Sequence, residues 1–205
     1  IWTYRLPGGA IGGWIARYDL KDGEKEVIPF TWGRNKDTGT EEPRMRAMPP
    51  QRPLYNLDRI EANPDAVILL NEGEKAADAS EKLFPQWIPT AIPGGSNAVR
   101  LADLTALEGR TVIILADHDG PGYEFVLKIM QNAPASTDLR MIVWPNHWPD
   151  SMGAGSYVME KGDDADDHVA AGWTTDLLRE VVGQGWKLTH SIEFLSEQPF
   201  EVIQY

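Results

Sequence analysis

The fold and chemistry of this chain follow from one stretch, Ile113-Ile114-Leu115-Ala116-Asp117-His118-Asp119-Gly120-Pro121-Gly122. An apolar run of strand character ends in two aspartates, and a Gly-Pro-Gly turn and a helical segment follow. Residues two apart on a strand point to the same face, so Asp117 and Asp119 project together from its carboxyl end. Two ionised carboxylates this close repel each other unless a cation lies between them or one is protonated. The pattern favours an all-oxygen site for Mg²⁺ or Mn²⁺; the alternative is a polar strand end followed by a turn.

The composition is that of a globular protein with one domain and an appendage, or with two small domains. Of the 205 residues, 42 % are hydrophobic and 24 % are charged. No apolar run approaches the roughly 18 residues of a membrane span. The chain contains no cysteine, which excludes thiolate zinc sites within it. The N-terminus shows no signal-peptide pattern. Because the chain begins at Ile1 rather than at Met, we expect it to be a piece of a longer protein.

Charge is distributed unevenly along the chain. The net charge is −12, yet residues 1–60 carry ten Lys and Arg against eight Asp and Glu, a balance of +2, which leaves −14 for the remainder. Nucleic-acid binding requires local positive charge, so a mildly basic N-terminal part beside an acidic body is compatible with a strand-binding surface, and it is also compatible with chance. Arg44, Arg46 and Arg52 are candidate nucleic-acid contacts, and a solvated loop is the alternative explanation for them.

The pattern of elements changes near residue 60. Strand-like runs at Ile11–Leu20 and Glu26–Trp32, joined by a turn, predict a hairpin, and the polar segment Asn35–Pro53 predicts a loop. From residue 65, apolar strands alternate with helices, which is typical of a parallel sheet covered on both faces. The expected strands cover 66–70, 88–92, 111–116 and 139–144, and the expected helices cover 54–62 (or a turn), 74–84, 96–101 (capped by Ser96 or Asn97), 122–132, 164–171 and 175–182.

Acidic residues follow three of these strands. Glu72 comes directly after the first, as Asp117 and Asp119 do after another, and a third cluster over 162–167 includes Asp164 and Asp167 at a helix start. Ligands gather at the carboxyl ends of parallel strands, so we expect these acids to share one edge of the sheet. The alternatives are a surface acid for Glu72 and simple helix capping for the third cluster.

Two further features suit a phosphate. The turn at Gly94 and Gly95 follows a strand and opens a helix, which leaves backbone N–H groups for an anion; a plain tight turn is the alternative. Lys75 lies in a first helical turn, where the helix dipole disfavours a cation. This mismatch predicts a phosphate contact, and a surface lysine paired with an acid is the alternative.

With these motifs in order, the chain resembles the Toprim fold shared by topoisomerases and primases, and more closely the Toprim primases of phages, plasmids and mobile elements. The family pattern is a glutamate after the first strand, Asp-x-Asp after a later strand, and a further acidic element, matched here by Glu72-Gly73, Asp117-His118-Asp119 and the segment 162–173. The resemblance covers residues 50–185, and residues 1–50 resemble the β-rich lead-in that often follows a zinc ribbon. It implies a β-rich subdomain over 1–60, a Toprim domain of parallel strands flanked by helices over 61–185, and a tail over 186–205 that leads to a missing domain.

The resemblance also implies a function. The expected protein is a DNA primase core, a nucleotidyltransferase that makes short RNA primers on single-stranded DNA from nucleoside triphosphates. Glu72, Asp117 and Asp119 would be catalytic, and together with Asp164 and Asp167 they would hold Mg²⁺ or Mn²⁺. A fused or associated helicase or ATPase domain and a cytoplasmic location in a bacterial host belong to the same expectation. Two alternatives stay open: a Toprim nuclease with the same metal site, and a non-catalytic nucleotide- or DNA-binding module of a larger primase–helicase.

Overall fold

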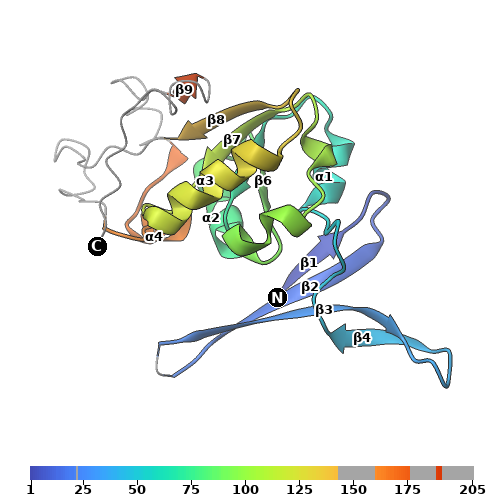
Figure 1. Cartoon of the computed structure of the whole chain (residues 1–205). Coiled ribbons are helices and arrows are strands. Elements are labelled where there is room, and N and C mark those ends of the chain that lie inside the picture. Colours follow the sequence, from blue (N-terminus) through green and yellow to red (C-terminus); the bar gives the residue numbers. More distant parts are fainter. Residues whose placement is uncertain (22, 143–159, 176–187, 191–205) are drawn as a thin grey trace.

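The structure, a computed structural model, describes residues 1–205 except 22, 143–159, 176–187 and 191–205. It contains a four-stranded antiparallel sheet from the N-terminal part and a five-stranded mixed sheet flanked by helices (Figure 1). This is the α/β architecture with a β-rich N-terminal part that the sequence predicts. In the part of the chain that is described, no helix combines the length and apolar character needed to cross a membrane.

The N-terminal sheet has the strand order β1-β2-β3-β4. Its strands are β1 (Trp2–Arg5), β2 (Ile11–Asp19), β3 (Lys25–Arg34) and β4 (Glu41–Met45). The predicted hairpin is confirmed, because β2 pairs antiparallel with β3. The loop prediction is wrong for Glu41–Met45, which pairs with β3 and places Pro43 opposite Trp32. An edge strand tolerates a proline that cannot donate a hydrogen bond, so Pro43 does not prevent pairing.

The larger sheet has the order β6-β5-β7-β8-β9, in which the first four strands are parallel and β9 is antiparallel. Its central strands are buried on both faces, and this explains their continuous apolar sequences. Leu69 and Leu70, for example, belong to two separate core clusters on opposite faces. The strands are β5 (Ile68–Asn71), β6 (Ile88–Ala91), β7 (Thr111–Leu115), β8 (Asp138–Ile142) and β9 (Leu188–His190).

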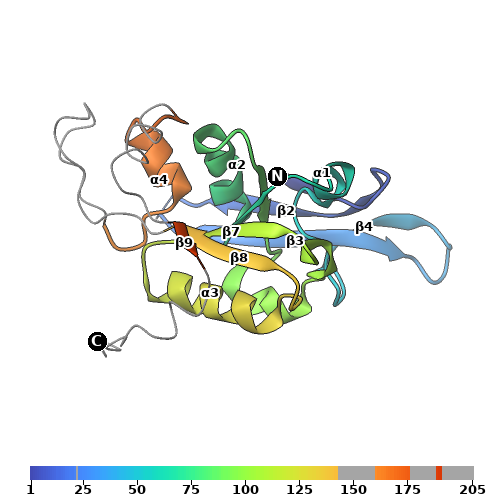
Figure 2. The ribbon, with the colours of Figure 1, turned by 90° about the horizontal axis from the view of Figure 1, so that it is seen from above.

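Helices cover both faces of this sheet, α2 and α4 on one and α3 on the other (Figure 2). Phe125 and Ile129 of α3 are fully buried in one core cluster, and Leu83 of α2 lies with Trp173 in the other. The helices are α1 (Leu57–Ala62), α2 (Glu74–Leu83), α3 (Gly120–Asn132) and α4 (Ala165–Ala170), with the 3₁₀ helices η1 (Gly95–Leu101) and η2 (Thr105–Leu107).

Several predicted element ends are corrected. The helix predicted from Gly122 begins at Gly120, because Asp119 is its N-cap. The prediction of Ser96 or Asn97 as a cap is wrong, because η1 starts at Gly95 after a left-handed Gly94 and no side chain caps it. Two predicted elements lie partly outside the described residues. These are the strand 139–144, beyond residue 142, and the helix 175–182, after its first residue.

The strand order creates a crevice at the carboxyl end of β5. The chain leaves β5 and returns as β6 on one side, whereas β7 lies on the other side. Asn71 at the end of β5 is level with Ala91 of β6 and with Leu115 of β7. The loops after these neighbouring strands therefore start at the same height and diverge, which is the arrangement that forms ligand sites in parallel sheets.

Candidate functional site

Asp117 lies in a tight loop between β7 and α3. Asp119, the N-cap of α3, accepts the Gly122 N–H through its Oδ1 at 2.8 Å. A Cβ added at Gly122 would lie 2.2 Å from the Asp117 carbonyl oxygen, so only glycine fits there. The Gly-Pro-Gly sequence thus lets the helix start directly against the loop and fixes where Asp117 leaves the sheet.

Backbone hydrogen bonds bring the third acidic cluster to this loop. The His118 N–H donates to the Asp163 carbonyl oxygen at 2.9 Å, and the Gly162 N–H donates to the His118 carbonyl oxygen at 3.1 Å. Asp164 and Asp167 then form a capping box at the start of α4, in which each carboxylate accepts a backbone N–H of the other residue. The capping explanation is correct for this pair, and Asp164 lies in addition at the cleft described next.

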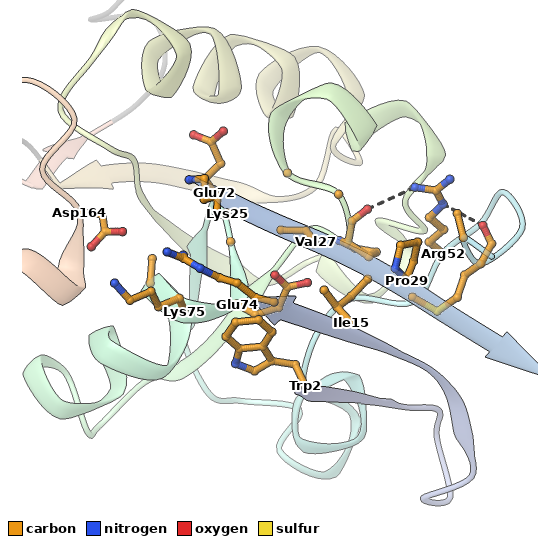
Figure 3. Close-up of a pocket in the computed structure, with 18 of the residues that line it drawn as sticks. Trp2, Ile15, Lys25, Val27, Pro29, Arg52, Glu72, Glu74, Lys75 and Asp164 are labelled. Atoms are coloured by element: carbon orange, nitrogen blue, oxygen red, sulfur yellow. Dashed lines mark hydrogen bonds between the residues drawn. The ribbon is translucent and has the colours of Figure 1, made fainter. Parts of the chain in front are cut away.

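A cleft of about 510 Å³ lies between the N-terminal sheet and the strand ends of the larger sheet (Figure 3). On one wall it is lined by Glu72, Asp117 and Asp164, the acids that follow three different segments of the chain. The structure therefore brings these three predicted residues to one place. Asp119 lies next to this group without lining the cleft, and Asp167 uses its carboxylate within the capping box.

Burial and neighbouring acids destabilise the charged form of Asp117. Burial and the neighbouring carboxylates Glu72, Asp164 and Asp119 raise the pKa of Asp117 from 3.8 to about 7. Burial also raises the pKa of Asp164, although backbone N–H groups partly offset this effect. Glu72 Oε2 is buried and has no hydrogen-bond partner among the described residues. A site of this kind favours a bound cation, which would relieve both the repulsion and the unpaired oxygen.

The donor set fits a hard divalent cation in its chemistry. It consists of carboxylate oxygens, the ligands that Mg²⁺ and Mn²⁺ prefer, and the described residues around it include no cysteine. Within the described part, no group of three acidic or histidine side chains stands close enough together to hold one ion without rearrangement. A metal held by three of these side chains would therefore require them to move closer together.

The opposite wall of the cleft carries two cations that the sequence did not single out. Arg17 of β2 and Lys25 of β3 line the cleft. Lys25, labelled in Figure 3, is close enough for its ammonium to lower the pKa of Asp117. Arg17 also bonds to Asp19 at 2.9 Å. The signal for Arg17 was its spacing, since it lies two residues from the buried Ile15 on the same face of a strand.

Of the residues predicted to contact phosphate or nucleic acid, some line the cleft and others do not. Gly94, Gly95 and Lys75 line the cleft, although the Gly95 N–H donates to Ile92 within its own turn and Lys75 pairs with Asp166 at 2.6 Å. Arg52 lines the cleft beside this turn and donates to the carbonyl oxygens of Met48 and Pro93.

The other two arginines lie elsewhere. Arg44 pairs with Glu42 on β4, and Arg46 is exposed; neither lines the cleft. Of the three predicted nucleic-acid contacts, the structure therefore places Arg52 alone beside the acidic wall.

The fold and the cleft together define a class: an α/β domain with an acidic rim, faced by a small β-sheet that bears basic residues. No protein-family model matches the chain, and no curated protein matches it. Solved structures of DNA primases are similar to it. The zinc-binding and RNA polymerase domains of the Aquifex aeolicus primase share 14 % identity with a TM-score of 0.50, covering 89 % of this chain and 39 % of that one.

Two other primase structures show lower TM-scores. The primase fragment of the bacteriophage T7 primase-helicase protein shares 20 % identity with a TM-score of 0.47, over 85 % of this chain and 67 % of that one. The catalytic domain of DnaG primase bound to single-stranded DNA shares 18 % identity with a TM-score of 0.49, over 92 % of this chain and 56 % of that one. The chain thus spans about two fifths of the Aquifex fragment, and the similarity shows the fold alone.

Proposed function

We propose that this chain is the catalytic core of a DNA primase, a nucleotidyltransferase that makes short RNA primers on single-stranded DNA. The observation that carries the proposal is the cleft, in which Glu72, Asp117 and Asp164 face Arg17 and Lys25. Its acidic wall suits divalent cations, and its basic wall suits the phosphates of nucleotides and a nucleic-acid strand. The similarity in fold to the Aquifex aeolicus primase supports the same proposal.

In this proposal, the acids at the strand ends act as one group. Glu72, Asp117 and Asp119, with Asp164 and Asp167 beside them, would hold Mg²⁺ or Mn²⁺. Bound there, the metal supplies charge neutralisation for the triphosphate and for the oxygens that attack and leave. The 3′ hydroxyl of one nucleotide attacks the α-phosphorus of the next, pyrophosphate leaves, and Glu72 Oε2, unpartnered among the described residues, accepts the hydroxyl proton or serves as a ligand.

The remaining cleft residues would position the phosphates. Lys75, Gly94 and Gly95 lie along the rim nearest the acids, where the β- and γ-phosphates of a nucleotide would be held. Arg17, Lys25 and Arg52 would bind the backbone of the template or the primer by charge–charge attraction. These contacts are independent of base sequence, so they position the strand and specify no template.

The order of motifs in the sequence supports a more specific proposal about the group of primases to which the chain belongs. We assign the chain to the Toprim primases of phages, plasmids and mobile elements, acting in the cytoplasm of a bacterial host. A helicase or ATPase domain, fused or associated, would open the duplex ahead of it. The T7 structure bears the name of a primase-helicase protein, which is consistent with this part of the proposal.

Primer synthesis tests the proposal. The chain is incubated with single-stranded DNA, labelled nucleoside triphosphates and Mg²⁺ or Mn²⁺, and compared with Glu72→Gln and Asp117→Asn. Glu108→Gln is the matched control, because Glu108 is exposed and lies away from the cleft. We expect products of a few nucleotides from the parent and the control, and at least about a hundredfold less from both cleft variants.

Other outcomes would replace the proposal. Metal-dependent cleavage of the DNA without synthesis, lost in the same two variants, would identify a nuclease. Binding of nucleotide or DNA with neither activity would identify a non-catalytic module.

A further inference from the structure

Strand β1 connects the N-terminal sheet to helix α2 through two side-chain hydrogen bonds. The Tyr4 hydroxyl donates to Glu74 Oε1 at 2.5 Å, and the Trp2 indole N–H donates to Asp78 Oδ2 at 2.7 Å. Glu74 and Asp78 are four residues apart on α2 and therefore lie on one face of the helix. The two donors are also on one face of β1, since they are two residues apart.

The surroundings fix this contact further. Tyr4 is fully buried and packs with Ile15 and Met48 in a core cluster of its own. The Tyr55 hydroxyl donates to the second oxygen of Asp78, Oδ1, at 3.0 Å, and its ring lies 5.7 Å from the ring of Tyr4. Both oxygens of Asp78 thus accept hydrogen bonds, one from Trp2 in β1 and one from Tyr55, which follows β4.

This contact lies at the wall of the cleft, next to the acids. Glu74 is two residues from Glu72, and both line the cleft together with Trp2 (Figure 3). In the sheet, Trp2 pairs with Ile15 of β2, the strand that carries Arg17. β1 therefore contacts both sides of the cleft. It bonds to α2, which begins beside the acidic wall, and it pairs with β2, which carries Arg17 of the basic wall.

The hydrogen bonds of this contact are directional, so they favour one relative position of β1 and α2. Burial of an acid such as Glu74, only 8 % exposed, is costly unless a donor compensates it. An apolar pair of similar size can stabilise an interface equally well, but it lacks the directional hydrogen bonds that these donors and acceptors make. A tyrosine hydroxyl and an indole N–H aimed at two carboxylates allow one arrangement of the two sheets.

We propose that Trp2 and Tyr4 are positioning residues that latch the N-terminal sheet onto α2 and so set the distance between the basic and acidic walls of the cleft. The effect of this latch on primer synthesis rests on the function proposed above. The effect of the latch on the distance between the two walls does not. Loss of the latch is expected to leave both sheets folded and to let the cleft widen.

A distance measurement tests the latch without reference to activity. The chain has no cysteine, so spin labels can be placed uniquely at Glu26→Cys on β3 and Gln131→Cys on α3, both of which are exposed. In the full chain we expect a single narrow distribution between them. The double change Trp2→Phe with Tyr4→Phe is expected to give a broader distribution with a longer mean.

Matched variants keep the test decisive. Tyr18→Phe makes the same change at an exposed tyrosine of the same sheet and is expected to leave the distribution unchanged. Asp78→Ala removes the partner of both Trp2 and Tyr55 from an exposed position, so it removes the Trp2 half of the latch without a core cavity if the double variant fails to fold. Glu74→Gln keeps an acceptor for Tyr4 and is expected to retain the narrow distribution.

Primer synthesis provides the second readout. We expect the double variant and Asp78→Ala to make about tenfold to a hundredfold less primer, because small displacements of reacting groups cost this much. An unchanged distance distribution in both would overturn the latch, whatever the activity. If the parent chain makes no primer, the proposed function fails, and the distance distributions still decide whether Trp2 and Tyr4 set the cleft.

Discussion

At residue 122 the chain has room for glycine alone. A side chain there would meet the Asp117 carbonyl oxygen, which is backbone and cannot move without displacing the acid. We predict that Gly122→Ala lowers the free energy of unfolding by about 1–3 kcal/mol in urea denaturation, the usual range for overpacking. Gly120→Ala is the control, because nothing lies within 4 Å of a Cβ added there. Equal stability of the two variants would show that the loop holding Asp117 is not tightly built.

Asp117 itself should make stability depend on pH. Its pKa rises to about 7 on folding, so the folded chain keeps this proton at pH values where the unfolded chain loses it. The contribution is complete below the unfolded pKa near 4 and is lost as the pH rises toward 7. Without divalent metal, we therefore predict that Asp117→Asn is more stable than the parent at pH 8 by about 1–2 kcal/mol, allowing for solvent screening.

The measurement is chemical denaturation in the presence of a chelator between pH 5 and pH 8. The advantage of Asp117→Asn should shrink as the pH is lowered, since the parent carboxyl regains its proton. A constant difference across this range would mean that Asp117 is not crowded by Glu72 and Asp164 in solution.

Part of the site could be predicted at the level of single residues. Glu72 and Asp117 follow apolar strands directly, and parallel pairing then forces their neighbouring positions. Arg17 and Lys25 could not be assigned in this way, because their role depends on how the N-terminal sheet packs against the strand ends. The same holds for Tyr4 and Glu74, whose contact joins residues 70 positions apart.

At the level of elements, the start of α4 combines two roles in one residue, because Asp164 is both the helix N-cap and part of the cleft wall. Asp164 accepts the N–H groups of Asp166 and Asp167 and also lines the cleft. Asparagine is as good an N-cap as aspartate, whereas alanine is not. We predict that Asp164→Ala loses about 1 kcal/mol of stability and that Asp164→Asn loses none.

Metal binding separates the two roles. If Asp164 is a ligand, both variants should bind Mg²⁺ more weakly in titration calorimetry, although Asp164→Asn alone keeps the cap. Normal binding by Asp164→Asn would restrict this residue to capping.

The success of the element predictions followed the strength of the local signal. Parallel strands with continuous apolar sequences and the β2–β3 hairpin were predicted correctly. β1, β4 and β9 were missed, because β1 and β9 are only four and three residues long and β4 contains Pro43 among charged residues. The cap at Ser96 or Asn97 was wrong because two glycines with positive φ turn the chain one step earlier.

At the level of the whole molecule, an acidic body faces a sheet that presents cations. With a net charge of −12, the chain needs local positive charge to bind a nucleic acid, and Arg17 and Lys25 of that sheet provide it at the cleft. We predict that Lys25→Ala weakens binding to single-stranded DNA uniformly across sequences and reduces the slope of log affinity against log salt by about 0.7, the value for one phosphate contact. Lys36→Ala is the control, because Lys36 is exposed and does not line the cleft.

Fluorescence anisotropy at several salt concentrations gives this slope. Equal slopes for Lys25→Ala, Lys36→Ala and the parent would show that the nucleic acid does not contact Lys25 in the cleft. The basic wall would then not have the proposed role.

The central claim is that acids from three separate segments form one cation site in the cleft. Mn²⁺ binding followed by electron paramagnetic resonance tests it most directly, with the parent, Glu72→Gln, Asp117→Asn and the exposed control Asp65→Asn. We predict saturable binding by the parent and the control, and at least about tenfold weaker binding by each cleft variant, as for loss of a group that supports a metal. Binding that Glu72→Gln and Asp117→Asn leave unchanged, or no saturable binding by the parent, would contradict the claim.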